Sequence, residues 1–468
     1  MSSLVVVGGG LAGSITAIAA ARNNPEAQIQ LVAPNGDRFA LHPGTIEVLG
    51  SIPDPADASQ ETADTGQTAQ QSDSTLSGGH VTNSRVHVTN PLEAIEFLPE
   101  THPYRIVGRD ALSEGLALCD EIVGYQGSET NALLPTPAGT VRPVFRYPPG
   151  MAAGVVSRPE PMRLIGVEQV PDFVPEYVGD RLAELVPYDI GTATVAFPGT
   201  VTEYPAATQL ADALDTDEPP EGEVGLPELD TDGELPPGLL GEPEDEGSLR
   251  EQLRERIRAE LDTEPRIGVP AVLGKREHDA IRSELEAAVG ARIFEIPIGA
   301  PSVPGRRLNA TLHRAVRDAG VTIHSGDIEA FETQNGRIER VSISPEPTDT
   351  KSDEELAVDS VVLATGDFVT DGLRATGDTI YEPRFECPVS HPERTAWTTP
   401  DPLASQPFTT VGLRIDDSCR VLGEDDNPVY DNLRAAGRII GGVDYDREGS
   451  GDGVAVATGF VAGRSSVE

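Results

Sequence analysis

Residues Leu4–Ala21, LVVVGGGLAGSITAIAAA, decide the fold that this sequence predicts. Leu4–Val7 is branched and apolar, as expected for a strand buried on both faces. Gly8, Gly10 and Gly13 then match the pattern G-x-G-x-x-G, and the small residues that follow favour a helix. A strand, a glycine turn and a helix in this order are typical of the unit that binds the phosphates of a dinucleotide.

Each glycine of the turn has a separate predicted role. Gly8 permits the tight turn, Gly10 lets a pyrophosphate approach the backbone, and Gly13 allows close packing of the helix on the strand. We therefore predict a bound nucleotide or flavin, held by Gly8, Gly9, Gly10, Leu11, Ala12 and Gly13. A structural turn without a ligand is the alternative. A membrane span or secretion signal is disfavoured, because no basic residue precedes the stretch and three consecutive glycines would destabilise a spanning helix.

The composition is strongly acidic. The formal net charge is −42 over 468 residues, and Lys275 and Lys351 are the two lysines. Such a surface indicates adaptation to molar salt, where the Debye length falls to about 3 Å and repulsion is screened. Because no basic stripe is present, we expect no nucleic-acid partner. Cys119, Cys387 and Cys419 are too scattered for a disulfide framework or metal site, so we expect buried thiols, no metal and a soluble cytoplasmic protein.

Two polar segments interrupt the predicted elements. Residues 53–90 and 212–247 contain too few apolar side chains to offset their ordering entropy, so we predict flexible acidic insertions. Between and around them the spacing predicts a series of elements. These are strand Gln28–Val32, a loop and short helix over Phe39–Gly50, a helix with Leu112, Leu116, Cys119 and Val123 on one face, β-like runs as far as Arg181, a helix capped by Ser248 and Glu251, a βαβ unit over Ile267–Leu273, His278–Val289 and Arg292–Ile298, a helix from Leu308 to Gly320, strands over Val321–Ser344 with a turn at Asn335–Gly336, and strand Ser360–Thr365.

The residues after the second predicted strand depart from the usual dinucleotide pattern. About twenty residues past the glycines, such sites normally offer an Asp or Glu to the adenosine ribose. This chain instead reads Ala33, Pro34 and Asn35. The departure weakens the case for NAD and, to a lesser degree, for FAD.

Three segments resemble the flavoproteins of the fumarate reductase type: GGGLAG (Gly8–Gly13), VVLATG (Val361–Gly366) and AAGRIIGG…GSGDGVAVATG (Ala435–Gly459). The chain resembles the B subunits of anaerobic glycerol-3-phosphate dehydrogenases more closely still, through FALHPGTIEVL, HPYRI and GAPSVPGRRLNATL (Gly299–Leu312). The resemblance implies an α/β fold with a discontinuous Rossmann-like flavin-binding domain. Its parts are expected at residues 1–130 and 301–468, around an inserted middle domain at residues 131–300.

The resemblance also implies an activity and an assembly. The family oxidises sn-glycerol 3-phosphate to dihydroxyacetone phosphate and sends the electrons through flavin to a quinone. It implies FMN as the cofactor, with FAD possible, and two partners: a second flavoprotein subunit and an iron–sulfur, membrane-associated subunit that would hold this chain at the inner face of the membrane. A stand-alone flavin oxidoreductase of another substrate class and a non-catalytic assembly subunit are the alternatives.

Candidate site residues follow from the same segments. The cofactor is expected at Thr365, Gly366, Gly441, Gly442, Gly451, Asp452 and Gly453, where a helix N-terminus would stabilise the negative charge of reduced flavin. His391, with Arg394 beside it, is a candidate base for the hydroxyl proton, although a lone histidine is more often structural. Arg306 and Arg307 precede the predicted helix at Leu308 and are candidates for the substrate phosphate. Salt bridges to the many carboxylates are the favoured alternative for this pair.

Overall fold

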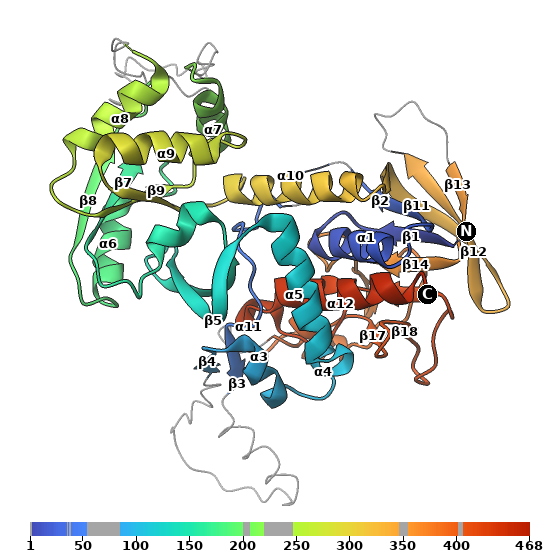
Figure 1. Cartoon of the computed structure of the whole chain (residues 1–468). Helices are drawn as coiled ribbons and strands as arrows, with labels where there is room; N and C mark the ends of the chain where they lie inside the picture. The colour runs from blue at the N-terminus through green and yellow to red at the C-terminus, as the bar shows by residue number, and fades with distance from the viewer. Residues whose placement is uncertain are drawn as a thin grey trace, which may run out of the picture.

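The computed structural model describes residues 2–34, 36, 39–53, 85–199, 206–219, 247–345, 354–400 and 406–468. Within this part of the chain, two β-sheets with separate hydrophobic clusters lie on opposite sides of the molecule (Figure 1). The larger cluster draws on residues from both halves of the sequence, whereas the smaller one is confined to residues between Ala153 and Val303.

The seven-stranded sheet is assembled from both halves of the chain, in the order β13-β12-β11-β2-β1-β14-β19. Leu4 pairs in parallel with Ile29 on one side and Ser360 on the other, so β1 is central. Its residues Leu4–Val7 are at most 2% exposed, which confirms the prediction of a strand buried on both faces. The strands are β1 Ser3–Val7, β2 Gln28–Ala33, β11 Thr322–Gln334, β12 Arg337–Pro345, β13 Glu354–Ala357, β14 Ser360–Leu363 and β19 Leu433–Ala435.

Helices α1 (Leu11–Asn23) and α12 (Gly451–Ser465) pack against each other beside this sheet (Figure 1). Their backbones approach closely because α12 presents glycines to α1. A Cβ on Gly459 would lie 2.8 Å from the Ala12 carbonyl oxygen, and one on Gly463 would lie 2.3 Å from that of Thr16. Helices α4 (Pro103–Val107) and α5 (Arg109–Val123) also contact α12. On α5, Leu112, Leu116 and Cys119 are buried as the spacing predicts.

The second sheet has four parallel strands in the order β10-β9-β7-β8. Its strands are β7 Met162–Val167, β8 Ile190–Val195, β9 Arg266–Pro270 and β10 Arg292–Ile296, and its helices are α6 Pro175–Ala183, α7 Ala207–Thr216, α8 Leu249–Ala259 and α9 His278–Val289. The parallel unit β9-α9-β10 confirms the predicted crossover. The capping box is also confirmed, because Ser248 and Glu251 each accept a backbone N–H of the other residue.

Short elements complete the described residues, and α10 (Val303–Asp318) connects the two sheets. Val303 belongs to the smaller hydrophobic cluster, whereas Leu308 and Leu312 belong to the larger one. The remaining pairs are β3 Ser51–Pro53 with β4 Arg85–His87, β5 Gln126–Pro135 with β6 Val141–Tyr147, β15 Arg374–Thr376 with β16 Thr379–Tyr381, and β17 Arg414–Ile415 with β18 Val421–Leu422; α3 is Pro91–Ala94 and α11 is Tyr445–Glu448. Among the helices described, none is both long and apolar enough to cross a membrane.

Several sequence predictions need correction. The short helix within Phe39–Gly50 is wrong, because its backbone groups bond to distant segments: Ile46 N–H to Arg146 and Gly50 N–H to Glu448. Helix α10 begins at Val303 and not near Leu308, since the Ser302 side chain caps it.

Two more boundaries differ from those that the sequence predicts. Residues 212–216 of the second acidic segment belong to α7, and Arg181 lies in α6, where the spacing predicts only β-like runs. The bulk of the two acidic segments, 54–84 and 220–246, lies outside the described residues, as does Asn35. All three cysteines are free and buried, as predicted. The proposed domain boundaries stay a prediction.

Candidate cofactor site

Backbone atoms lie directly against two of the three glycines in the turn after β1, Gly8 and Gly13. Gly8 has φ +118°, and a Cβ there would lie 2.1 Å from the carbonyl oxygen of Ala364. A Cβ on Gly13 would lie 1.8 Å from the carbonyl oxygen of Gly8. These contacts show why the turn, β14 and α1 can meet only where side chains are missing. Gly8 and Gly13 thus serve the packing of the turn itself.

Gly10 differs from its neighbours because the chain's own packing does not require it. A Cβ there would meet no atom within 4 Å, and its φ of −78° is open to any residue. Gly10 is the N-cap of α1 and provides no side-chain hydrogen bond, and no acidic residue occupies the first turn. Free space beside an uncapped helix N-terminus is an arrangement that accepts a phosphate group.

A second loop, after β14, lies directly against this turn. Gly366 has φ +82°, and Thr370 donates its hydroxyl to the Thr365 carbonyl oxygen at 2.8 Å. The Thr365 hydroxyl oxygen is buried and has no hydrogen-bond partner among the described residues. The same holds for the hydroxyl of Ser14 in α1. Because buried hydroxyls are normally bonded, two orphans beside a glycine turn fit the polar edge of a ligand.

The glycine-rich tail reaches the same region through Gly437 and α12. A Cβ on Gly437 would lie 2.7 Å from the Cβ of Ala12. α12 begins at Gly451, where a Cβ would lie 2.9 Å from the guanidinium of Arg438. A Cβ on Gly453 would lie 2.0 Å from the Tyr104 hydroxyl.

The other two glycines predicted in this tail lie just before α11. A Cβ on Gly441 would lie 2.6 Å from the backbone nitrogen of Gly412, and Gly442 has φ +81°. Of these tail glycines, Gly437 is the one that lies against Ala12, in the first turn of α1. The cofactor roles of these residues stay predictions.

Asp452 is engaged by His42, a residue that sequence reasoning did not place in the site. The Gly44 N–H donates to His42 Nδ1 at 3.0 Å, which leaves the proton on Nε2. His42 Nε2 then donates to Asp452 Oδ1 at 3.0 Å, and the Glu47 N–H donates to Asp452 Oδ2 at 3.0 Å. Burial alone would raise the pKa of Asp452, but His42 and the Glu47 N–H hold that pKa below its usual value.

Glu47 is a second carboxylate beside α12. Its carbonyl oxygen accepts the Gly453 N–H at 2.8 Å, and its Oε1 lies 2.8 Å from Nε of Arg142. Burial raises the pKa of Glu47 from 4.5 to about 7, against the opposing charge of Arg142, and Asp452 raises it further. A buried carboxyl group that titrates near neutrality beside a predicted cofactor site is a candidate for proton transfer.

A second histidine, His102, contacts the same C-terminal segment through Glu448. The Tyr104 N–H donates to His102 Nδ1 at 3.1 Å, and His102 Nε2 donates to Glu448 Oε2 at 3.1 Å. His42 and His102 each precede a proline, and each uses Nδ1 to accept the N–H two residues on. The His-Pro sequence alone does not specify these contacts, because His391 also precedes a proline, yet its Nδ1 contacts the Pro392 carbonyl oxygen. No periodicity could have revealed the distant carboxylates that His42 and His102 bind.

The predicted phosphate and base candidates lie in other surroundings. Arg307 is within the first turns of α10, where its guanidinium bonds both carboxylate oxygens of Glu295 and also the Gly274 carbonyl oxygen. This is the salt bridge that the sequence favoured as the alternative. Arg306 follows the N-terminal Pro304 in the same helix. The structure therefore places both arginines inside the helix and not before it.

His391 is held by backbone at both ring nitrogens. Its Nε2 accepts the Ile380 N–H at 3.2 Å, and its Nδ1 donates to the Pro392 carbonyl oxygen at 2.9 Å. The imidazole could accept a proton only by breaking the first of these bonds. Arg394 is largely exposed and lies 3.4 Å from Asp378. These contacts favour a structural role for His391 in the described chain.

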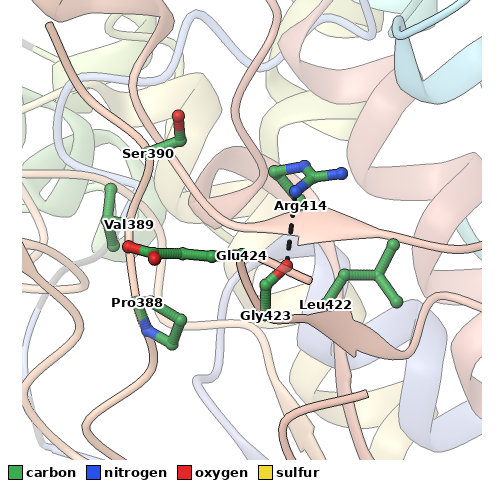
Figure 2. Close-up of a pocket in the computed structure, with 7 residues that line it drawn as sticks. All are labelled: Pro388, Val389, Ser390, Arg414, Leu422, Gly423 and Glu424. Atoms are coloured by element: carbon green, nitrogen blue, oxygen red, sulfur yellow. Dashed lines mark hydrogen bonds between the residues drawn. The ribbon is translucent and has the colours of Figure 1, made fainter. Parts of the chain in front are cut away.

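A pocket of about 260 Å³ opens near His391 but contains none of the predicted site residues (Figure 2). Its lining combines the segment before His391 with the β17–β18 hairpin: Pro388, Val389, Ser390, Arg414, Leu422, Gly423 and Glu424. Arg414 donates to the Gly423 carbonyl oxygen at 3.3 Å, as Figure 2 shows, and also pairs with Asp426. With its cation already bonded, this pocket has no feature that indicates a reaction.

Comparison with known proteins follows the same segments. The profile of the FAD binding domain family matches residues 3–454. A protein of Halobacterium salinarum, named as the probable B subunit of anaerobic glycerol-3-phosphate dehydrogenase, is 34% identical, over 100% of this chain and 98% of its own length. The B subunit of the Actinobacillus succinogenes enzyme is 28% identical, over 97% and 96% of the two chains. That of Yersinia enterocolitica is 26% identical, over 98% and 96%.

Proposed function

Because the chain belongs to the family of anaerobic glycerol-3-phosphate dehydrogenase B subunits, within the FAD binding domain family, we propose that it is the flavoprotein subunit of such an enzyme. The chain is an oxidoreductase that binds a flavin. Its proposed reaction is the oxidation of sn-glycerol 3-phosphate to dihydroxyacetone phosphate with a quinone as the final acceptor. A bound flavin supplies the hydride acceptor for this chemistry.

The open space beside Gly10 carries this proposal. It lies at the uncapped N-terminus of α1, and the hydroxyls of Thr365, in the loop after β14, and of Ser14, in α1, have no partner among the described residues, so the residues present fit a flavin phosphate. The N-terminus of α12, which begins at Gly451, would favour negative charge on a reduced cofactor placed beside it. We propose FAD over FMN, since the matching family profile describes FAD binding.

The remaining roles are part of the proposal. Of the two arginines predicted to bind the substrate phosphate, Arg307 is already paired with Glu295, so we propose no phosphate contact for it. The partners would be a second flavoprotein subunit and an iron–sulfur subunit at the membrane, which would hold this chain at the inner face. These partners would complete electron transfer to the quinone.

A substitution at Gly10 tests the cofactor site without disturbing the fold. Gly10→Val should fold normally, because no atom lies within 4 Å of the new Cβ, yet it should lose the flavin by occupying the phosphate space. Gly299→Val is the matched control, because a Cβ at Gly299 also meets no atom. Flavin released by denaturation is identified by chromatography, and circular dichroism reports the fold. Full flavin content in Gly10→Val would contradict the proposed site.

A further inference from the structure

Glu47 lies where four charged or titratable groups from different parts of the fold meet. Arg142 of β6 binds its carboxylate, His42 donates to Asp452, and Asp452 accepts the Glu47 N–H. Arg438, from the 3₁₀ turn Gly437–Ile439, is the fourth group whose charge acts on Glu47. Its carboxylate is mostly buried, and Gly449 lies beside it. Glu47 is therefore a buried acid with one direct cation and a neighbouring carboxylate.

The backbone of Glu47 ties this acid to the first turn of α12. Its N–H donates to Asp452, and its carbonyl oxygen accepts the N–H of Gly453, so both peptide groups are fixed. The hydroxyl of Thr45, two residues earlier, is buried without a partner among the described residues. Unsatisfied hydroxyls are rare in folded proteins, so this orphan is a second sign that the segment faces a ligand.

We propose that Glu47 takes up the second proton when the flavin is reduced. The inference rests on the proposed function, which places the cofactor at the N-terminus of α12. A hydride from glycerol 3-phosphate, which is two electrons and one proton, would leave a bound flavin with one negative charge, while the substrate's hydroxyl proton goes to solvent. A proton from solvent then forms an O–H bond on the Glu47 carboxylate. Negative charge developing beside a carboxylate favours its protonated form. Protonation removes the negative charge of Glu47, so that the N-terminus of α12 has only the charge of the reduced flavin to stabilise.

Proton uptake on reduction is the direct test. The purified protein with its flavin is reduced at an electrode through a viologen mediator, which exchanges electrons and no protons, in weakly buffered molar KCl at pH 8, and a pH indicator reports the protons bound. Glu47→Gln should take up fewer protons than the wild type, by up to about one per flavin. The midpoint potential of its flavin should also depend less steeply on pH between 7 and 9.

A matched control and a second variant make the outcome decisive. Glu382 is another buried carboxyl, held by the Arg384 and Phe385 N–H groups, and Glu382→Gln should match the wild type. Arg142→Gln removes the cation beside Glu47, so the pH at which half of the second proton is taken up should rise. Wild-type uptake in Glu47→Gln, or an unshifted pH in Arg142→Gln, would overturn the inference. A wild-type protein that binds no flavin would instead refute the proposed function.

Discussion

Replacing Arg307 by methionine should destabilise the part of the molecule around β9 and β10. The Arg307 side chain is 9% exposed and that of Glu295 is 2% exposed, so the variant leaves a buried carboxylate without its cation. Loss of one partner from such a pair costs about 3–5 kcal/mol. The remaining bond to Glu295, from the Leu273 N–H at 3.0 Å, cannot replace the lost charge. We therefore expect the free energy of unfolding to fall by an amount within this range.

Amide hydrogen exchange measured by mass spectrometry in molar KCl gives the opening free energy of peptides from β9 and β10. The double variant Arg307→Met with Glu295→Gln serves as the control, because it removes both charges and should recover most of the loss. A loss under about 1 kcal/mol would show that the pair behaves like an exposed salt bridge. If Arg307→Met instead left stability unchanged and raised KM for glycerol 3-phosphate, the phosphate-binding role would be restored and the structural role of the pair refuted.

Three further predictions concern charge and segment boundaries. Folding raises the pKa of Glu47 from 4.5 to about 7, so its contribution to stability is present below pH 4.5 and is lost as the pH rises through 7. The free energy of unfolding in urea should therefore favour Glu47→Gln over the wild type by about 3 kcal/mol more at pH 8 than at pH 4. The net charge of −42 predicts loss of circular dichroism on transfer from molar KCl to dilute buffer, and an unchanged melting temperature would contradict salt adaptation. Pro53 pairs with Arg85, so replacing residues 54–84 by a short glycine turn should leave flavin content intact; its loss would show that this segment supports the site.

Local sequence signals are sufficient for much of the fold. The strand before Gly8, the capping box at Ser248 and the helix His278–Val289 follow from apolar spacing and end signals within a few residues. The predicted start of α10 is wrong although Ser302 and Pro304 are ordinary signals for a helix N-terminus. Arg306 and Arg307 suggest a phosphate site in front of a later helix, and that interpretation leads to a predicted start near Leu308 in place of the cap at Ser302.

The candidate site is predictable only in its glycines. Gly8, Gly10 and Gly13 have fixed spacing, so the turn that they form can be predicted from the chain alone, and its cofactor role stays a prediction. The Glu47 N–H and Asp452 are 405 residues apart in sequence, and no pattern along the chain indicates their contact. His42 is absent from the predicted site for the same reason. Long-range pairing of polar side chains depends on tertiary structure, which periodicity does not encode.

The position of β1 at the centre of a sheet drawn from both halves of the chain constrains how the protein is made. Ser3 bonds Asp359, 356 residues away, and the ribosome needs roughly 20 to 70 s to synthesise that interval. During this time β1 and α1 have emerged without β14 and α12, whereas the strands and helices between Met162 and Ile296 already have their own sheet partners. The nascent chain must therefore keep a fully apolar strand from aggregating until its last neighbours arrive, and the flavin can be captured only near the end of translation.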